Sequence, residues 1–325
     1  MRPLFTIATI TYNSGKWVRQ AIESVLASSY TDFEFIISDD FSSDDTWSII
    51  QEYDDPRIKV SQNKPNLGEY ANRNKVLDAA TGQFIFFIDG DDILYKDTLQ
   101  MLQRLIKAFP TAGMIWGVPV NDIDFAVLPC LLTPRQIIQI MFFTPLSITS
   151  IGLAETVFSV DALRSIGGFS TEFAIGDTYI KRKLAVTTMV LLTPTGFSFW
   201  RRSGNQASKR ASKKYRSFID LHQINQSVLN DPTLPLNETE TQQAVLNTRI
   251  SEIKLMVSNT LLKGRLSDFF LLMKKLDVSF SELLLLLQKG KFDYKIVADI
   301  SDPLMNNYHF ISSKDDVVNA TISSH

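Results

Sequence analysis

Short apolar runs recur along the first 118 residues, and each is followed by a polar loop or an amphipathic stretch. The runs that predict strands lie near residues 4–10, 33–38, 57–61, 84–88 and 113–117. The amphipathic stretches that predict helices lie near residues 16–28, 44–53, 68–80 and 97–108. Strands that alternate with helices indicate an α/β fold with a parallel sheet covered on both faces. Ligands of such sheets bind beyond the carboxyl ends of the strands.

The fourth apolar run ends abruptly in three carboxylates, in the motif Asp89-Gly90-Asp91-Asp92. Oxygen ligands of this kind suit Mg²⁺ and Mn²⁺, and Mg²⁺ in particular takes only one or two protein carboxylates beside phosphates and water. The motif therefore predicts a divalent cation at the edge of the sheet. The alternative is a turn that caps the helix expected to begin near residue 96.

Five separate elements of the first hundred residues together resemble the family 2 glycosyltransferases of the GT-A fold. In chain order they are Ile10-Thr11-Tyr12-Asn13, the acidic segment 39–46, Asn66-Leu67-Gly68 with Asn72-Arg73-Asn74, Ala80-Thr81-Gly82-Gln83, and Asp89-Gly90-Asp91-Asp92. The resemblance extends from residue 3 to about 99, weakens through the middle of the chain and is absent after about residue 210. It implies a Rossmann-like central sheet flanked by helices, and an inverting transfer from a nucleotide-diphosphate sugar.

The resemblance also implies a metal site that helps the diphosphate to leave. Asp91 is its stronger ligand, and Asp89 contacts ribose or metal-bound water. A divalent cation, Mn²⁺ or Mg²⁺, offsets the charge that develops on the leaving group. Gly90 between the two acids permits close approach of the diphosphate.

Further donor-binding residues follow from the same resemblance. Of the acids after the second strand, alternation directs only one toward a bound base, and we favour Asp40 over Asp39. Asp40 would accept the imide hydrogen of uracil, while Tyr12, which follows Ile10 in the first motif, stacks on the base. Arg73 would reach phosphate or base. The alternatives are helix and turn capping for the acids and a solvated arginine on a helix.

An inverting transfer also needs a general base for the acceptor hydroxyl. The family carries a Glu-Asp pair after a Gly-Gly-Phe segment, with the aspartate as base and an arginine about five positions later. Here the segment 167–169 leads to Gly176-Asp177 and then to Arg182, so Asp177 is the predicted base and the glutamate is replaced by glycine. The alternative for Asp177 is a helix cap. The fallback bases are Glu172 and Glu155.

A second departure from the family lies in the segment 199–208, which follows the last expected core strand. Ser203 stands where the family often has a histidine. Arg201, Arg202 or Lys209 can supply the missing charge, or the basic run meets solvent or anionic lipid. No Gln-x-x-Arg-Trp segment of the processive synthases is present, which favours the addition of a single sugar.

Composition narrows the partners and the compartment. The 33 basic and 35 acidic residues nearly balance, so we expect no nucleic-acid partner. A single cysteine, Cys130, excludes an internal disulfide and fits a reducing compartment. The first strand begins almost at once, without a visible export signal, and every apolar run falls short of the roughly 18 residues of a spanning helix. We expect a cytoplasmic protein, peripheral at most to the inner face of the membrane.

The chain divides into three parts by composition. Residues 1–118 form the nucleotide-sugar-binding α/β half, residues 119–208 the acceptor-binding half of the same catalytic domain, and residues 209–325 a helical carboxyl-terminal region. Helices are predicted in this last region over 239–262, 265–275 and 281–288. Their apolar runs can pack on the core, join a homo-oligomer or rest on a membrane.

Three hypotheses follow for the function. The first is a metal-assisted, inverting transfer of one sugar from a nucleotide-diphosphate donor, most simply a UDP-sugar, to a glycan or glycolipid. The second is a degenerate member that binds nucleotide or glycan, or scaffolds an assembly, without catalysis. The third is a nucleotidyltransferase, which would need a glycine-rich basic loop after the first strand to bind the triphosphate. The segment 11–16 has only one glycine and one lysine, so the sequence gives this hypothesis little support.

Overall fold

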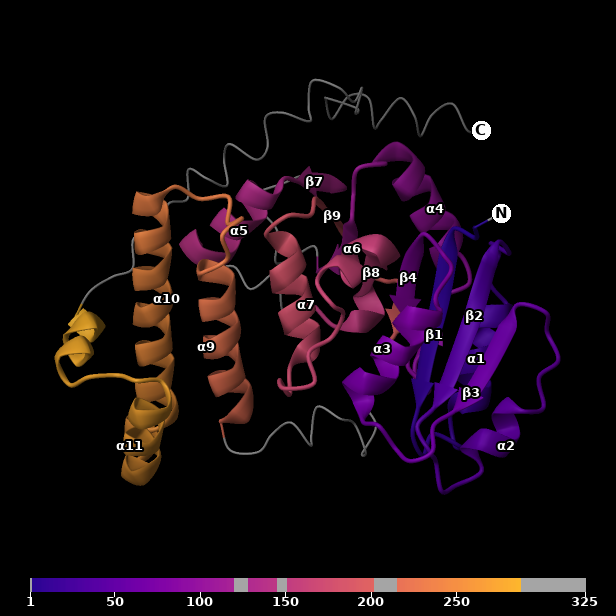
Figure 1. Ribbon diagram of the computed structural model, residues 1–325, viewed down its shortest axis with the longest axis horizontal. Coiled ribbons are helices and arrows are strands. Elements are labelled where there is room, and N and C mark those ends of the chain that lie inside the picture. Colours follow the sequence, from indigo (N-terminus) through magenta and orange to yellow (C-terminus); the bar gives the residue numbers. More distant parts are fainter. Residues whose placement is uncertain (1, 120–127, 145–150, 202–214, 288–325) are drawn as a thin grey trace, which may run out of the picture.

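The computed structural model describes residues 2–119, 128–144, 151–201 and 215–287 (Figure 1). Eight strands in these ranges form one sheet in the order β3-β2-β1-β4-β8-β6-β9-β7. They are β1 (Phe5–Thr11), β2 (Phe33–Asp39), β3 (Ile58–Gln62), β4 (Phe84–Phe87), β6 (Met114–Val118), β7 (Cys130–Leu132), β8 (Thr156–Ser159) and β9 (Val190–Pro194). The five strands predicted in the first part of the chain are thus confirmed within one or two residues at each end.

The sheet is mixed, whereas the alternating pattern predicts a parallel one. Strands β1 to β4 are parallel to one another. Strand β8 lies between β4 and β6 and is antiparallel to both, and β7 is antiparallel to β9. The strand β8 spans only four residues, Thr156–Ser159, and so short a pattern does not predict the direction of a strand. The sheet also joins strands from both sides of residue 118, and the division at residues 118 and 208 stays a prediction.

Helices cover both faces of this sheet, as the pattern predicts (Figure 1). They are α1 (Val18–Leu26), α2 (Thr46–Ile50), α3 (Glu69–Ala79), α4 (Thr98–Ala108), α5 (Pro134–Phe143), α6 (Val160–Ser165) and α7 (Gly176–Ala185). Alternation along the strands fills two cores: Ile7 and Phe86 face the core under α1 and α4, and Ala8 and Phe87 face the core under α3 and α7. A short antiparallel pair, β5 (Ile93–Leu94) with β10 (Ser198–Phe199), was not predicted.

The carboxyl-terminal region described here consists of α9 (Arg216–Leu229), α10 (Glu238–Asn259), α11 (Leu266–Lys275) and short 3₁₀ turns. Helix α9 packs against α7 and α10, so this region is joined to the sheet domain (Figure 1). Helices α10 and α11 confirm the predicted ranges, but Ser281–Leu287 is a 3₁₀ segment rather than an α-helix. Across the ranges described, helices are all too short or too polar to cross a membrane.

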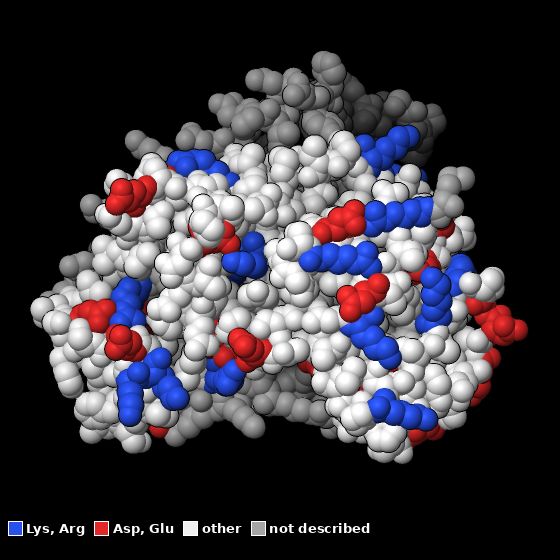
Figure 2. All heavy atoms as spheres, viewed as in Figure 1, with Lys and Arg blue, Asp and Glu red and all other residues white. Residues whose placement is uncertain are grey.

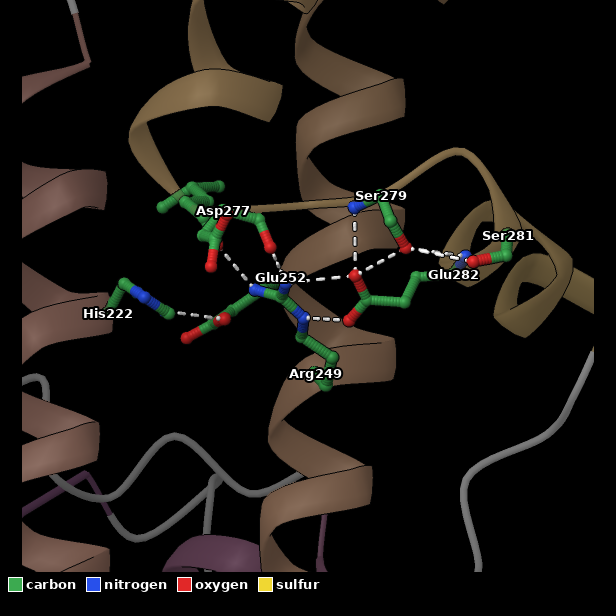
Figure 3. Close-up of polar contacts among 8 residues, drawn as sticks. His222, Arg249, Glu252, Asp277, Ser279, Ser281 and Glu282 are labelled. Atoms are coloured by element: carbon green, nitrogen blue, oxygen red, sulfur yellow. Dashed lines mark hydrogen bonds and ion pairs between the residues drawn. The ribbon is translucent and has the colours of Figure 1, made fainter.

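Polar contacts hold the last helices together (Figure 3). Arg249 of α10 donates from Nε to Glu282 Oε1 at 2.7 Å and from Nη1 to the Leu276 carbonyl at 2.7 Å. His222 of α9 lies buried with its Nδ1 2.8 Å from Glu252 Oε2. These bonds hold the 3₁₀ segment Ser281–Leu287 on α10 and fix the packing of α9 on α10.

Candidate functional site

The carboxyl ends of β1, β2 and β4 meet at one edge of the sheet, where the sequence places the donor residues. The Thr11 carbonyl accepts from Asp40 N at 2.8 Å, and the Ile10 carbonyl accepts from Gly90 N at 3.3 Å. A Cβ added at Gly90 would lie 2.8 Å from Thr11 Cγ2, so only glycine fits between these loops. The structure therefore brings the first motif, the acids after β2 and the Asp89–Asp91 motif together.

Asp39 and Asp40 have different structural roles at this edge. The fully buried Asp39 carboxylate accepts from Thr11 Oγ1 at 2.9 Å and from the Ser42 backbone N at 3.0 Å, which holds the turn after β2. Asp40 accepts from Leu67 N at 2.8 Å through Oδ1 and from Gly68 N at 2.9 Å through Oδ2. Asp40 thus anchors the turn that starts α3.

One lone-pair position of Asp40 and two partly exposed aromatic rings lie at this edge. Asp40 also accepts from Asn63 Nδ2 at 2.9 Å, which uses three of the four lone-pair positions of a carboxylate. Tyr12 is 43% exposed beside it, and Phe41, which sequence reasoning did not select, is 48% exposed with a backbone φ of 65°. An exposed ring next to a carboxylate can stack on a base whose edge the carboxylate reads.

Arg73 on α3 is buried, so the alternative of a solvated arginine is wrong. Its Nη2 donates to Asp89 Oδ2 at 2.8 Å and to Glu69 Oε1 at 3.1 Å, and its guanidinium lies 5.3 Å from the centre of the Phe87 ring. Its Nε and Nη1 are buried and have no hydrogen-bond partner. Buried donors without partners are costly in a folded protein and mark a place where a ligand could bind.

Negative charge gathers next to Arg73. Asp89 Oδ1 is buried without a hydrogen-bond partner, while Asp91 is half-buried with its backbone carbonyl accepting from Arg201 Nε at 2.9 Å. Asp92 is 3% exposed, and burial followed by the charge of Asp89 raises its pKa to about 8. A divalent cation fits this group of acids, because it would satisfy the orphaned oxygen and offset the repulsion.

Within the ranges that the structure describes, no three histidine, cysteine, aspartate or glutamate side chains converge into a ready-made metal cage. A cation that is held mainly by diphosphate and water needs only one or two protein carboxylates. The acids after β4 match that sparse type of site.

The described part of the basic segment after β10 ends at Arg201, which contacts the loop after β4. The Arg201 backbone N donates to Asp92 Oδ1 at 3.0 Å, and its guanidinium stacks 4.0 Å from the centre of the Trp17 ring. Arg201 is therefore fastened to the loop that carries the acids. Ser203, Arg202 and Lys209, which the sequence singles out, lie outside the described residues.

The predicted base, Asp177, lies in the first turn of α7. Its Oδ2 is 3.8 Å from Nζ of the fully buried Lys181, and its side chain is 32% exposed. Its negative charge, with that of Asp89, adds to burial in raising the pKa of Glu69. Asp177 and Asp89 thus both lie within electrostatic range of Glu69.

Glu69 is the site residue that sequence reasoning missed. It follows the glycine that starts α3, where an acid is ordinary because the helix dipole favours negative charge at its first turn. Only the fold shows that it pairs with Arg73 and lies within electrostatic range of Asp177. Of the two fallback bases, Glu155 accepts from Gly196 N at 2.9 Å and holds a backbone turn, and Glu172 lies on an exposed loop.

The helical region reaches the loop that carries the predicted base. Asp220 on α9 is buried and accepts from Ala174 N at 2.6 Å, and the Ala174 carbonyl accepts from the Tyr70 hydroxyl at 3.2 Å. Arg182, five positions after Asp177, is buried by the same packing, and this burial lowers its pKa to about 10. The sequence spacing between α7 and α9 carries no signal of this contact.

Comparisons with known proteins agree with the fold that the sequence predicts. Residues 6–144 match the sequence model described as Glycosyl transferase family 2. The GalNAc(5)-diNAcBac-PP-undecaprenol beta-1,3-glucosyltransferase of Campylobacter jejuni is 38% identical over 105 residues, which cover 31% of this chain and 34% of that protein. The Escherichia coli UDP-Glc:alpha-D-GlcNAc-diphosphoundecaprenol beta-1,3-glucosyltransferase WfgD is 38% identical over 98 residues, 30% of this chain and 39% of that protein. The chain thus spans well under half the length of these relatives.

Solved structures resemble a larger part of the chain. Staphylococcus aureus TarS 1–349 in complex with UDP-GlcNAc superimposes with a TM-score of 0.63 at 20% identity, covering 90% of this chain and 82% of that one. Mannosyltransferase PcManGT from Pyrobaculum calidifontis, in complex with GDP-Man and Mn²⁺, gives 0.56 at 18% identity, covering 95% and 89%. At these identities the likeness shows the fold, which is the GT-A type that the sequence predicts. Over residues 6–144, the chain is thus similar to Glycosyl transferase family 2.

Proposed function

We propose that the protein is an inverting glycosyltransferase that moves one sugar from a UDP-sugar to a glycan or glycolipid, with help from Mn²⁺ or Mg²⁺. The observation that carries this proposal is that helix α3 touches both groups of predicted site residues: Arg73 donates to Asp89, and the Tyr70 ring lies against Gly176, which precedes Asp177. A sugar between these two groups would have its leaving diphosphate on one side and a carboxylate on the other. That arrangement suits attack from the face opposite the leaving group.

On the donor side, Asp40 and Tyr12 would hold the uracil, with Ile10 fixing the loop between them. Asp91 and Asp89 would hold the cation, which supplies charge compensation on the diphosphate when it is bound. Arg73 fixes Asp89 and has two donors to spare for a diphosphate oxygen that reaches it. The UDP complexes of TarS support this choice of donor class.

On the acceptor side, Asp177 would take the proton of the acceptor hydroxyl as its oxygen bonds to the anomeric carbon. The bond from that carbon to the diphosphate breaks, and the nucleoside diphosphate leaves. The names of two relatives place their acceptors on diphospho-undecaprenol, which supports a lipid-linked glycan as the acceptor here.

A lipid-linked acceptor calls for contact with a membrane surface, and α11 offers a fitting face. Leu266, Phe270 and Leu271 are 44–57% exposed on α11, with Lys274 and Lys275 at the end of the same face. An apolar face with lysines fits the interface of an anionic bilayer. Elsewhere, on the face shown in Figure 2, basic and acidic side chains are interspersed.

Co-sedimentation with anionic vesicles tests this face, and the double variant Phe270→Ser/Leu271→Ser should bind them more weakly than the wild type. A homo-oligomer through the carboxyl-terminal helices stays the alternative use of this face, and sedimentation velocity without lipid would reveal it.

The decisive experiment for the function is a donor panel. The protein is incubated with UDP-, GDP- and dTDP-sugars, Mn²⁺ and undecaprenyl-diphosphate-linked glycans, and release of the nucleoside diphosphate is measured. Release with one donor, dependent on acceptor, supports transfer. Binding of UDP without turnover of any donor would instead favour a non-catalytic nucleotide-binding protein, and release of pyrophosphate from a nucleoside triphosphate would favour a nucleotidyltransferase.

A further inference from the structure

The side-chain space at Gly176 is occupied by another residue. A Cβ added at Gly176 would lie 2.9 Å from Cε2 and Cζ of Tyr70. The Tyr70 ring is fixed there, because it stacks on Phe169 with ring centres 5.7 Å apart and its hydroxyl donates to the Ala174 carbonyl at 3.2 Å. The family's glutamate could therefore not be restored at Gly176 unless the Tyr70 ring moved.

The residue before Tyr70 brings a carboxylate to the same place. Glu69 Oε1 accepts from Arg73 Nη2 at 3.1 Å, and Oε2 makes no hydrogen bond within the described residues. The Glu69 side chain is 33% exposed, whereas the Arg73 side chain is 2% exposed. Glu69 therefore lies on the open side of the ion pair, with an oxygen free to accept from a ligand.

Glu69 also lies near the predicted base, because the ring of the next residue, Tyr70, lies against Gly176, which precedes Asp177. Burial comes first among the causes that raise its pKa, and the negative charges of Asp89 and Asp177 act in the same direction. The positive charge of Arg73 acts in the opposite direction and lowers the pKa of Glu69. Glu69 thus borders both the leaving-group side and the acceptor side of the site.

We propose that Glu69 is an acceptor-binding carboxylate, which accepts a hydrogen bond from a sugar hydroxyl of the acceptor and orients it toward Asp177. The proposal rests on the proposed function. Tyr70 fills the volume at Gly176, and Glu69 supplies the carboxylate that Gly176 cannot. During transfer the acceptor proton passes to Asp177, the acceptor oxygen bonds to the anomeric carbon, and the bond from that carbon to the departing nucleoside diphosphate breaks. Glu69 keeps its charge and its bond to Arg73.

Glu69→Gln tests this role by steady-state kinetics and by UDP titration in the presence of Mn²⁺. We expect the KM for the acceptor to rise on the order of tenfold, since a hydrogen bond to a charged group is weakened, while the Kd for UDP stays at the wild-type value. Glu69→Asp should recover part of the loss. Glu52→Gln, which alters a surface glutamate paired with Arg19, is the matched control and should change neither constant.

A rescue variant separates a missing carboxylate from a damaged fold. In Glu69→Gln/Tyr70→Ala/Gly176→Glu, the space beside α7 is opened and a carboxylate enters from position 176. We expect its acceptor KM to fall below that of the matched variant Glu69→Gln/Tyr70→Ala. Equal values in these two variants would count against the proposal.

The outcomes for the inference and for the function differ. An unchanged acceptor KM in Glu69→Gln overturns the inference but not the proposed function. If the Kd for UDP also rises, Glu69 acts only through Arg73. Absence of turnover by the wild-type protein with every donor overturns the proposed function and this inference with it.

Discussion

The donor edge and the acceptor side of the candidate site are built in different ways. At the donor edge, Asp39 and Asp40 are held by hydrogen bonds from groups less than thirty residues away in the chain. Asp177 depends instead on two distant segments: Glu69 of α3 lies within electrostatic range of it, and Asp220 of α9 holds the loop at Ala174 just before it. A short sequence motif can therefore identify the residues of a candidate donor site. The residues of the acceptor side come together only when the chain folds, so a motif does not identify them.

Asp91→Asn should show the largest effect and should fall on the donor side. Loss of the carboxylate weakens the hold on the cation that compensates the diphosphate, so we expect turnover to fall on the order of a thousandfold and UDP affinity to lose its dependence on Mn²⁺. Donor turnover and UDP titration with and without Mn²⁺ measure this. Wild-type values for both would remove Asp91 from the site.

Asp177→Asn should give a loss that falls on the acceptor side alone. The amide cannot take the acceptor proton, so kcat should drop on the order of a hundredfold or more, while the Kd for UDP with Mn²⁺ stays unchanged. Measuring kcat and the Kd for UDP together separates an effect on the acceptor side from one on the donor edge. A rise in the Kd for UDP would show that the two sides are not separate.

Glu34 tests the stability of the donor half. Its carboxylate accepts from Thr6 Oγ1 at 2.6 Å, Lys59 Nζ at 2.7 Å and Gly82 N at 3.0 Å, which ties β1 and β3 to the loop before β4. Burial by itself would raise its pKa, but the bonds from Lys59, Thr6 and Thr81 outweigh burial and lower the pKa from 4.5 to about 2.

Because the folded pKa is depressed, the stabilisation by Glu34 is complete above about pH 4.5 and is lost as the pH falls toward 2. A shift of this size corresponds to about 3 kcal/mol of unfolding free energy. Glu34→Gln should lower the free energy of unfolding in urea at pH 7 by up to that amount and by less at pH 3. The exposed Glu52→Gln serves as control, and an equal loss at both pH values would contradict the prediction.

Asp220→Ala should show the smallest effect and should reveal whether the helical region supports the acceptor side. The Ala174 N–H loses its partner, at a cost of about 1–3 kcal/mol, and the loop before Asp177 loosens. We expect kcat to fall by less than tenfold and UDP affinity to stay unchanged. Asp220→Asn keeps an acceptor oxygen, so its kcat should lie between those of the wild type and Asp220→Ala. A change in UDP affinity instead would show that the donor and acceptor sides are not built separately.

Much of the donor half could be predicted from the sequence, since strands, helices and polar loops alternate there with a regular period. The acids after β2 and β4 meet because the carboxyl ends of neighbouring parallel strands share one edge. The antiparallel direction of β8 could not be predicted, because a pattern of four residues does not indicate which strands it will pair with. The role of Glu69 could not be predicted either, because an acid at a helix start fits the dipole equally well.

The sequence by itself determined the α/β class, the positions of the first strands and the acidic motif, because periodicity and turn chemistry are local properties. Only the tertiary structure decided that Arg73 is buried against Asp89, that Tyr70 fills the space at Gly176, and that α9 reaches the loop of the predicted base. These contacts join residues from 16 to more than 100 positions apart in the chain. They depend on how helices dock on the sheet, which the local pattern of residues does not record.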